Sequence, residues 1–339
     1  MSEETVSDTA EPEATIRGGD GWVTRLLARR EIGVFIGFLF LFGLIAVTKP
    51  NIFFNWDSMS GITARLLRQI SVYVIIGIGM TYLIIGGEFD LSVGSMFAVG
   101  GLTFAMFLGM GLPQIVALLL VLVLGMVVGV INGTIVTKAG IPSLITTIGM
   151  LSALRGIALY ITPGGSRQVP ETAFINLFGG SVHVFGLEIA HQVFWSIGLV
   201  VVFGYVLQRT RFGYHVYAVG DDEEAAQMTG INTDRVKMIN FVITGALAAF
   251  AGITAISYFG SMFGTAGQTY ELLVIASVVI GGTNLFGGEG SLSGTFLGAL
   301  VIGVIPVLLV LNGLPVEVQE FLTGVVIIAA VLLDITIRR

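Results

Sequence analysis

Apolar runs long enough to cross a bilayer follow one another through almost the whole chain. A helix needs about 20 mainly apolar residues to cross the hydrocarbon core. Only 11% of the 339 residues are charged, whereas a soluble domain carries about 25%. The runs are continuous and do not alternate, which favours helices over a barrel. We therefore predict an all-α polytopic membrane protein with about ten spans, at about 32–48, 67–86, 93–110, 113–136, 142–162, 190–207, 238–258, 271–286, 293–312 and 317–334.

The distribution of Lys and Arg predicts the orientation of these spans. Ten spans place both ends of the chain on one side, and cytoplasmic loops are enriched in Lys and Arg. With the N-terminus inside, eleven of the 16 basic residues lie inside and five outside. We therefore predict an N-in, C-in topology with the loop 163–189 outside and the loop 208–237 in the cytoplasm.

The N-terminal part differs from the rest in composition. Residues 1–20 are acidic and nearly free of large apolar side chains, which is typical of a disordered tail. We predict an acidic cytoplasmic tail and interfacial segment over 1–30, and a single transmembrane domain over 31–339. The first apolar run follows about thirty polar residues, unlike the short leader of a cleavable signal. Cysteine is absent, which excludes disulfides and thiol chemistry.

One polar stretch, residues 209–237, interrupts the apolar sequence. Its middle predicts a short helix that begins with Asp221 as N-cap, and Glu224 can reach back to it as in a capping box. Gly230 supplies the expected C-terminal stop. A short helix by itself is only marginally stable in water, so this one should lie against the membrane part of the chain or against a partner protein. Ala225 and Ala226 give it a smooth face, although an ordinary capped loop helix remains the alternative.

Two glycine-rich stretches, 86–95 and 281–294, predict broken helices. Each combines a pair of glycines with an acid and ends in a Leu-Ser-containing segment, and this likeness suggests a short internal repeat. Broken helices at membrane depth occur where protein or a water-filled cavity satisfies the freed backbone groups. The candidate pathway residues in these breaks are Gly86, Gly87, Glu88, Asp90, Ser92, Gly281, Gly282, Gly287 and Gly288.

Acids near membrane depth are functional candidates by default, and Glu88 and Asp90 are two of them. Residues at i and i+2 point apart on a helix, so these acids do not form a catalytic dyad. The alternative is that they cap the next helix or lie at the water boundary. Arg155 suits a structural ion pair, and Glu271 suits the start of a span. The Gly-xxx-Gly pairs at 125/129 and 294/298 predict close helix packing.

Several function classes have no support in the sequence. The three His residues are scattered and show no metal-ligand spacing. The phosphate-binding motif G-x-x-x-x-G-K-[ST] is absent, so we expect no ATP or other cofactor to bind this chain. No basic and aromatic surface indicates nucleic acid.

Four motifs, in order, resemble those of one family. They are G-E-F-D-L-S-V-G-S (87–95), G-I-P-S-L-I-T-T-I-G-M (140–150) continuing into L-R-G-I-A-L-Y-I-T-P-G (154–164), A-V-G-D-D-E-E-A-A-Q-M-T-G-I-N (218–232) and I-A-S-V-V-I-G-G-T-N-L-F-G-G-E-G-S-L-S-G-T (275–295). In these motifs the chain resembles the inner-membrane permeases of ABC importers for ribose, xylose, arabinose and galactose. Many members of that family have Gly-Gly-Ile-Asp where this chain has Gly87-Glu88-Phe89-Asp90.

The resemblance implies a partner-dependent, multi-pass inner-membrane transporter. Asp221, Glu224, Ala225, Ala226 and Gly230 would belong to a coupling helix that docks on a separate cytoplasmic ATPase. ATP and Mg²⁺ would bind that ATPase, an external binding protein would deliver a monosaccharide, and a second permease copy would complete a homodimer. The permease itself would perform no chemistry.

Two other functions remain open at this point. A proton-coupled secondary transporter of a small polar solute would use Glu88 and Asp90 as a relay, and it would have no ATPase to dock. An intramembrane enzyme is disfavoured because no paired acids on separate spans, Ser/His pair or metal cluster is found in the sequence.

Overall fold

The computed structural model describes residues 30–338, and helices dominate it, as predicted. The helices are α2 (Arg30–Thr48), α3 (Pro50–Phe53), α4 (Trp56–Ile85), α5 (Val93–Gly109), α6 (Gln114–Ala139), α7 (Ser143–Ile161), α8 (Ala173–Gly179), α9 (His191–Arg209), α10 (Arg211–Asp221), α11 (Glu223–Met228), α12 (Thr233–Phe259), α13 (Tyr270–Ile280), α14 (Leu292–Leu311) and α15 (Val316–Arg338). The strands are β1 (Ser166–Gln168), β2 (Ser181–Val184), β3 (Leu187–Ala190) and β4 (Ser261–Phe263). The predicted tail and interfacial segment at 1–30 lie outside the described residues, apart from Arg30.

Seven of the described helices are long and apolar enough to cross a membrane: α2, α4, α6, α7, α9, α12 and α14. The apolar helices α5 and α13 are shorter. Each of the ten predicted spans overlaps one helix, but the span predicted at 271–286 extends too far. The helix α13 ends at Ile280 because two glycines follow it, and the chain then enters the glycine-rich stretch. The exact number of spans stays a prediction.

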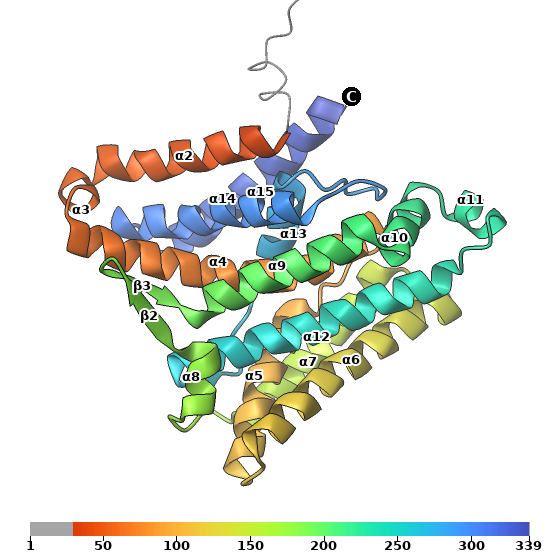
Figure 1. Cartoon of the computed structure of the whole chain (residues 1–339), viewed down its shortest axis with the longest axis horizontal. Coiled ribbons are helices and arrows are strands. Elements are labelled where there is room, and N and C mark those ends of the chain that lie inside the picture. Colours follow the sequence, from red (N-terminus) through yellow and green to blue (C-terminus); the bar gives the residue numbers. More distant parts are fainter. Residues whose placement is uncertain (1–29, 339) are drawn as a thin grey trace, which may run out of the picture.

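The centre of the molecule is formed by α4 and α12, with α5 packed beside them (Figure 1). The apolar window of α4 is 89% buried and that of α12 is 72% buried, whereas the windows of α2, α7 and α9 are 6%, 22% and 17% buried. The outer helices therefore present large apolar side chains to their surroundings. Such a surface suits lipid acyl chains or the apolar face of another transmembrane helix, because apolar side chains need no hydrogen-bond partners there.

The predicted Gly125-xxx-Gly129 packing seam is confirmed. These two glycines of α6 lie against the backbone of α12 at Gly245 and Phe241, so closely that a Cβ atom at either position would overlap backbone atoms. The second pair behaves in the same way, because Gly294 and Gly298 of α14 lie against the backbone of α13. Small residues are what let helix backbones approach this closely.

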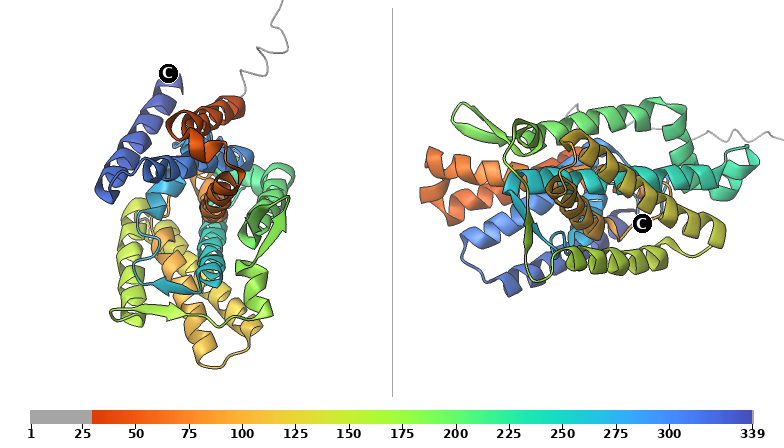
Figure 2. Two further views of the ribbon diagram at one scale, coloured as in Figure 1. Left: turned by 90° about the vertical axis from the view of Figure 1, so that its left-hand side faces the viewer. Right: turned by 90° about the horizontal axis from the view of Figure 1, so that it is seen from below.

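The long helices run between two ends of the molecule (Figures 1 and 2). At one end lie α10 and α11; we call this the α11 end. The opposite end carries α3, α8 and two short antiparallel sheets, and we call it the β1 end. There β1 pairs with β4 in the register Ser166↔Phe263, and β2 pairs with β3 in the register Ser181↔Ala190. The two ends correspond to the predicted inside and outside loops.

Candidate functional site

The short helix predicted in the polar stretch is present, but its N-cap lies one residue later than expected. Asp221 is the last residue of α10, and the N-cap of α11 is Asp222, whose side chain accepts a hydrogen bond of 2.9 Å from the Ala225 amide. The prediction of Asp221 as N-cap is therefore wrong, because the preceding residues form a separate helix. Gly230 ends α11 as expected, with a φ of 85°. Its amide donates to Gln227, and the next amide donates to Ala226, which satisfies the last carbonyls of the helix.

The two alanines of α11 face in different directions. Ala226 is 4% exposed and packs against the chain's own core, so it anchors the helix and does not offer a docking surface. Ala225 and Glu224 are exposed, and Met228 is 88% exposed. The outward face of α11 therefore includes Glu224, Ala225, Gln227 and Met228.

The two glycine-rich breaks share one backbone geometry. The C-cap of α4 is Gly86, and Gly87 has a φ of 82°; the C-cap of α13 is Gly281, and Gly282 has a φ of 96°. In both, the amide after the second glycine donates to the third-last helical carbonyl, as Glu88 does to Leu83 at 2.9 Å. This is the Schellman arrangement, which favours glycine at the left-handed position. The local likeness predicted from the sequence is thus confirmed for the first half of each stretch.

Both breaks meet the end of α10 at the α11 end of the molecule. The amide of Gly288 donates to the carbonyl of Ile85 at 2.9 Å. The same carbonyl lies against Gly220, where a Cβ atom would overlap it, and Gly287 lies against the Gly220 carbonyl. The φ values of Gly287 and Gly288 are 92° and 75°, so both need the freedom of glycine. We call this meeting point of Ile85, Gly220, Gly287 and Gly288 the junction.

A tyrosine of α10 adds a third contact to the junction. The Tyr217 hydroxyl donates to the carbonyl of Gly290 at 2.7 Å. Burial raises the pKa of the Tyr217 phenol, so it stays protonated and able to donate. At the far side of the same break, Glu31 of α2 accepts hydrogen bonds from Ser293 at 2.7 Å and Ser291 at 3.2 Å. The second break is therefore held from both sides.

A single lysine connects α11 to the first break. Lys237 of α12 lies 2.9 Å from Glu88 and 2.7 Å from Glu223, the first residue of α11. The side chains of Lys237 and Glu88 are 14% and 12% exposed, and that of Glu223 is 40% exposed. A movement of α11 is therefore opposed by a mostly buried ion pair that reaches the α4–α5 turn. In the sequence Lys237 is one of the basic residues expected inside, and no local pattern pairs it with Glu88.

The Asp90 side chain accepts hydrogen bonds at the start of α5, directly before its N-cap region. Its Oδ1 accepts from the Ser92 amide at 2.8 Å and from the Ser92 hydroxyl at 2.5 Å, and Asn132 donates to Oδ2 at 3.3 Å. Asp90 is 2% exposed, so it does not lie at the water boundary. The helix that it precedes begins at Val93. On α7, the Ser143 hydroxyl accepts a hydrogen bond from the Phe89 amide and the Thr147 hydroxyl accepts one from the Leu91 amide. These two bonds fix the turn on either side of Asp90.

The charged residues Arg155 and Glu271 differ from their expected use. Arg155 donates at 2.8 Å to the carbonyls of Gly264 and Ala266, and it does not come within 4 Å of an acid among the described residues. The predicted structural ion pair of Arg155 is therefore wrong, because the backbone beside it is not helical and leaves carbonyls to satisfy. Glu271 lies in the first turn of α13, as predicted.

Metal binding has no support within residues 30–338, because no three His, Cys, Asp or Glu side chains gather there into a group that could hold an ion. The predicted pathway and coupling residues instead form a backbone-centred site. The structure brings Gly287 and Gly288 against α10 and links Glu88 to α11 through Lys237, while Gly86 and Gly87 form the turn that begins the first break. Gly281 and Gly282 form the turn that begins the second break.

Comparison with known proteins supports one assignment across the chain. A sequence profile described as "Branched-chain amino acid transport system / permease component" matches residues 62–331. The ribose import permease protein RbsC of Haemophilus influenzae is 36% identical over 88% of this chain and 91% of its own length. The fructose import permease protein FrcC of Rhizobium meliloti is 34% identical over 89% and 83%, and the autoinducer 2 import system permease protein LsrC of Photorhabdus luminescens is 33% identical over 91% of each chain. No solved structure matches the chain.

Proposed function

The chain belongs to the family of permease subunits of ABC importers, and from this premise we propose that it carries a monosaccharide, a pentose or a hexose, delivered by an external sugar-binding protein. It is a multi-pass membrane protein and a translocation subunit, not an enzyme. The sugar is proposed because relatives that cover nearly the whole chain have ribose and fructose import in their names.

The outward face of α11 is the proposed contact with the ATPase subunit. ATP and Mg²⁺ would bind that partner, because the sequence has no phosphate-binding loop. The helix has only six residues and projects at one end of the molecule (Figure 1). A helix of this length gains little stability of its own, and its exposed Met228 and Ala225 suit burial in a partner's cleft.

The junction would carry movement of α11 into the membrane part. Two separate sets of contacts join these helices to the breaks. The Lys237 ion pair joins α11 to the first break, and the backbone contacts of Gly220 join α10 to both breaks. Closure of the ATPase subunits would displace α11, and these connections would shift the turns at Gly87 and Gly288. Such a shift would switch the pathway between outward- and inward-facing states. This convergence on one junction is the observation that carries the proposed mechanism.

A second copy of this chain is the proposed membrane partner. One protomer leaves α7 and α9 mostly unburied, and exposed apolar helix faces associate readily in a membrane when small residues lie among them. On α7, Gly149 and Gly156 have open space around them. The proposed working unit is therefore a homodimer with two ATPase subunits.

The proton-coupled alternative gains nothing from the geometry. A relay needs acids that can exchange protons along a path, whereas Glu88 is held by Lys237 and Asp90 by Ser92 and Asn132.

The test is ATP-driven uptake of D-ribose into vesicles that contain the permease, its ATPase and its binding protein. We expect uptake to require ATP and the binding protein and to survive collapse of the proton gradient. Glu224→Lys should abolish uptake and co-purification of the ATPase, because a like or unpaired charge at an interface costs several kcal/mol.

The matched control is Glu171→Lys, the same change at an exposed site between β1 and α8. It should leave ATPase co-purification intact. Uptake that persists in Glu224→Lys and stops when the gradient collapses would contradict the proposal.

A further inference from the structure

The chain between β4 and α13 is not helical, although it runs beside the apolar helices α5 and α7. Helix α13 has 11 residues and therefore spans about 16 Å, about half of the hydrocarbon core of about 30 Å. The non-helical segment 264–269 precedes this short helix. It starts beside Ala158 and Thr162 near the β1 end of α7, and it reaches Gly94, the second residue of α5, which follows the first break.

This segment exposes polar side chains. Thr265, Gln268 and Thr269 are exposed, and Thr269 has a left-handed φ of 65°, which is uncommon for a residue with a branched Cβ. Non-helical backbone at membrane depth is tolerated where protein buries it or where it lines a water-filled cavity. Since the protomer itself does not cover these side chains, they face either water or a second chain.

Two opposite charges lie directly behind the exposed segment. The Arg155 guanidinium donates to the carbonyls of Gly264 and Ala266 at 2.8 Å. The Glu271 carboxylate packs onto Gly94, where a Cβ atom would occupy its place. Its Oε2 atom is buried without a hydrogen-bond partner. Arg155 and Glu271 interact electrostatically but are not within ion-pair distance, so both keep hydrogen-bonding capacity.

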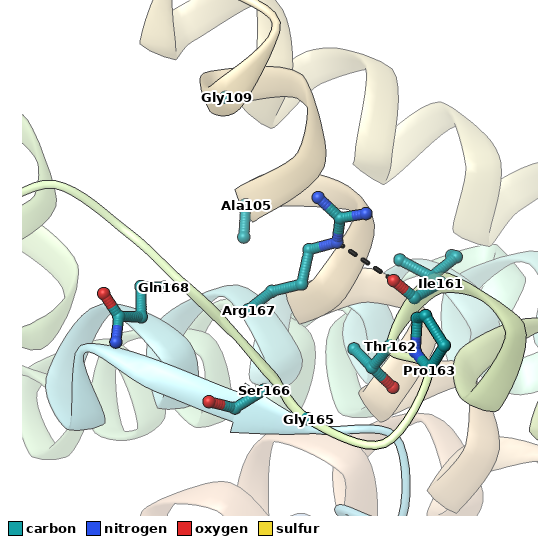
Figure 3. A pocket seen from close by; sticks show the side chains of 9 residues that line it. All are labelled: Ala105, Gly109, Ile161, Thr162, Pro163, Gly165, Ser166, Arg167 and Gln168. Atoms are coloured by element: carbon teal, nitrogen blue, oxygen red, sulfur yellow. Dashed lines mark hydrogen bonds between the residues drawn. The ribbon is translucent and has the colours of Figure 1, made fainter.

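A pocket opens at the β1 end (Figure 3). Its volume of about 390 Å³ falls within the range of small-molecule sites. Thr162, Ser166, Arg167 and Gln168 line it between the ends of α5 and α7. Thr162 follows Arg155 by seven residues on α7, which corresponds to about 10 Å along the helix. Polar groups thus follow one another from the pocket at the β1 end to Arg155 and then to Glu271.

We propose that Arg155 and Glu271 form a station about halfway across the membrane that binds the hydroxyl groups of a neutral polyhydroxylated solute on its way from the pocket. A carboxylate accepts hydrogen bonds from hydroxyls, and a guanidinium donates to hydroxyl oxygens. Because the two charges are opposite, the site has no net charge that would retain a small ion. The inference rests on the proposed function, since it names residues along the transport path.

The first test uses the absence of native cysteine. In the complete importer, Gln268→Cys and Thr269→Cys are each exposed to a small anionic methanethiosulfonate reagent. Val201→Cys, at a position 65% exposed midway along α9, is the control for a membrane-depth surface without polar neighbours. We expect both variants to react at least 100-fold faster than the control. Equal rates would overturn the proposal, even if ATP-driven uptake is normal.

The second test concerns the solute class. D-ribose supplied with binding protein and ATP should slow labelling of Thr269→Cys several-fold, whereas L-leucine should not. Protection by L-leucine alone would overturn the assignment to a polyol. Glu271→Gln should lower D-ribose uptake at least tenfold while stimulation of the ATPase by the loaded binding protein stays, and Glu317→Gln, the same change at an exposed acid in the first turn of α15, should change neither.

Normal uptake by Glu271→Gln would refute the station. Failure of the proposed function would appear differently, as absence of ATP-dependent uptake in the unchanged protein.

Discussion

Removal of the Lys237 charge should lower the free energy needed to open the turn at the first break, and the geometry allows an estimate of this change. Two unit charges about 4 Å apart attract by about 4 kcal/mol at an effective dielectric constant of about 20. Desolvation offsets part of this, but truncation of one partner leaves the other charge buried, which costs about 3–5 kcal/mol. For Glu88, whose side chain is 12% exposed, we expect Lys237→Met to cost about 3 kcal/mol, or about 100-fold in the opening equilibrium of the turn.

The assay is hydrogen exchange of the backbone amides in and beside the two breaks, measured on the permease in lipid nanodiscs. The amides of Glu88 and Gly288 are hydrogen-bonded in the closed junction, so their protection reports local opening. Lys237→Met should lower their protection about 100-fold. The double variant with Glu88→Gln should recover most of the loss, because replacing both partners of a buried pair is often nearly neutral.

An exposed ion pair between α6 and α12 provides the matched control. Lys138 and Asp234 lie 2.6 Å apart with side chains 66% and 41% exposed. Exposed pairs contribute about 0–1 kcal/mol, so Lys138→Met should leave protection at both breaks within about threefold of the unchanged protein. Equal effects of Lys237→Met and Lys138→Met, or no recovery in the double variant, would refute the reasoning about burial.

Three further predictions concern topology and the glycines. A membrane-impermeant thiol reagent should label Ser166→Cys in whole cells and leave Thr229→Cys unlabelled; the reverse would overturn the orientation. Gly288→Val should reduce transport more than Gly87→Val, because both glycines have positive φ but only the former lies against α10; equal transport by both would contradict a tight junction. Gly230→Val should cost about 1–2 kcal/mol through its left-handed φ alone and weaken ATPase binding without loss of membrane insertion, and unaltered ATPase co-purification would count against the role of this turn.

The helical fold could be predicted because the thickness of the bilayer sets the length of the apolar runs in the sequence. Each predicted span overlaps a helix, since a run of about 20 apolar residues has few other structures available in lipid. The exception is α13, where apolar residues continue past Ile280 and Gly281 ends the helix. Hydropathy alone does not distinguish an apolar turn from an apolar helix.

The candidate site was predicted in its parts but not in its contacts. Glycine pairs marked both breaks because left-handed turns need glycine, and Gly230 was placed correctly for the same reason. The pairing of Lys237 with Glu88 joins residues 149 positions apart (237 − 88), and no local pattern encodes such a contact. Gly220 was missed because its importance comes from the approach of Ile85 and Gly287, which depends on the packed fold.

The glycine seam between α6 and α12 also limits how this protein can change shape. Gly125 and Gly245 hold the two helices backbone to backbone, so little sliding is possible without overlap of main-chain atoms. The two helices are therefore expected to move as one rigid unit. Deformation during a transport cycle is therefore expected outside this unit, for example at the turn that Gly281 and Gly282 form after α13. Distance measurements between labels on α6 and α12 should consequently stay constant through the cycle, while distances from these two helices to α14 change.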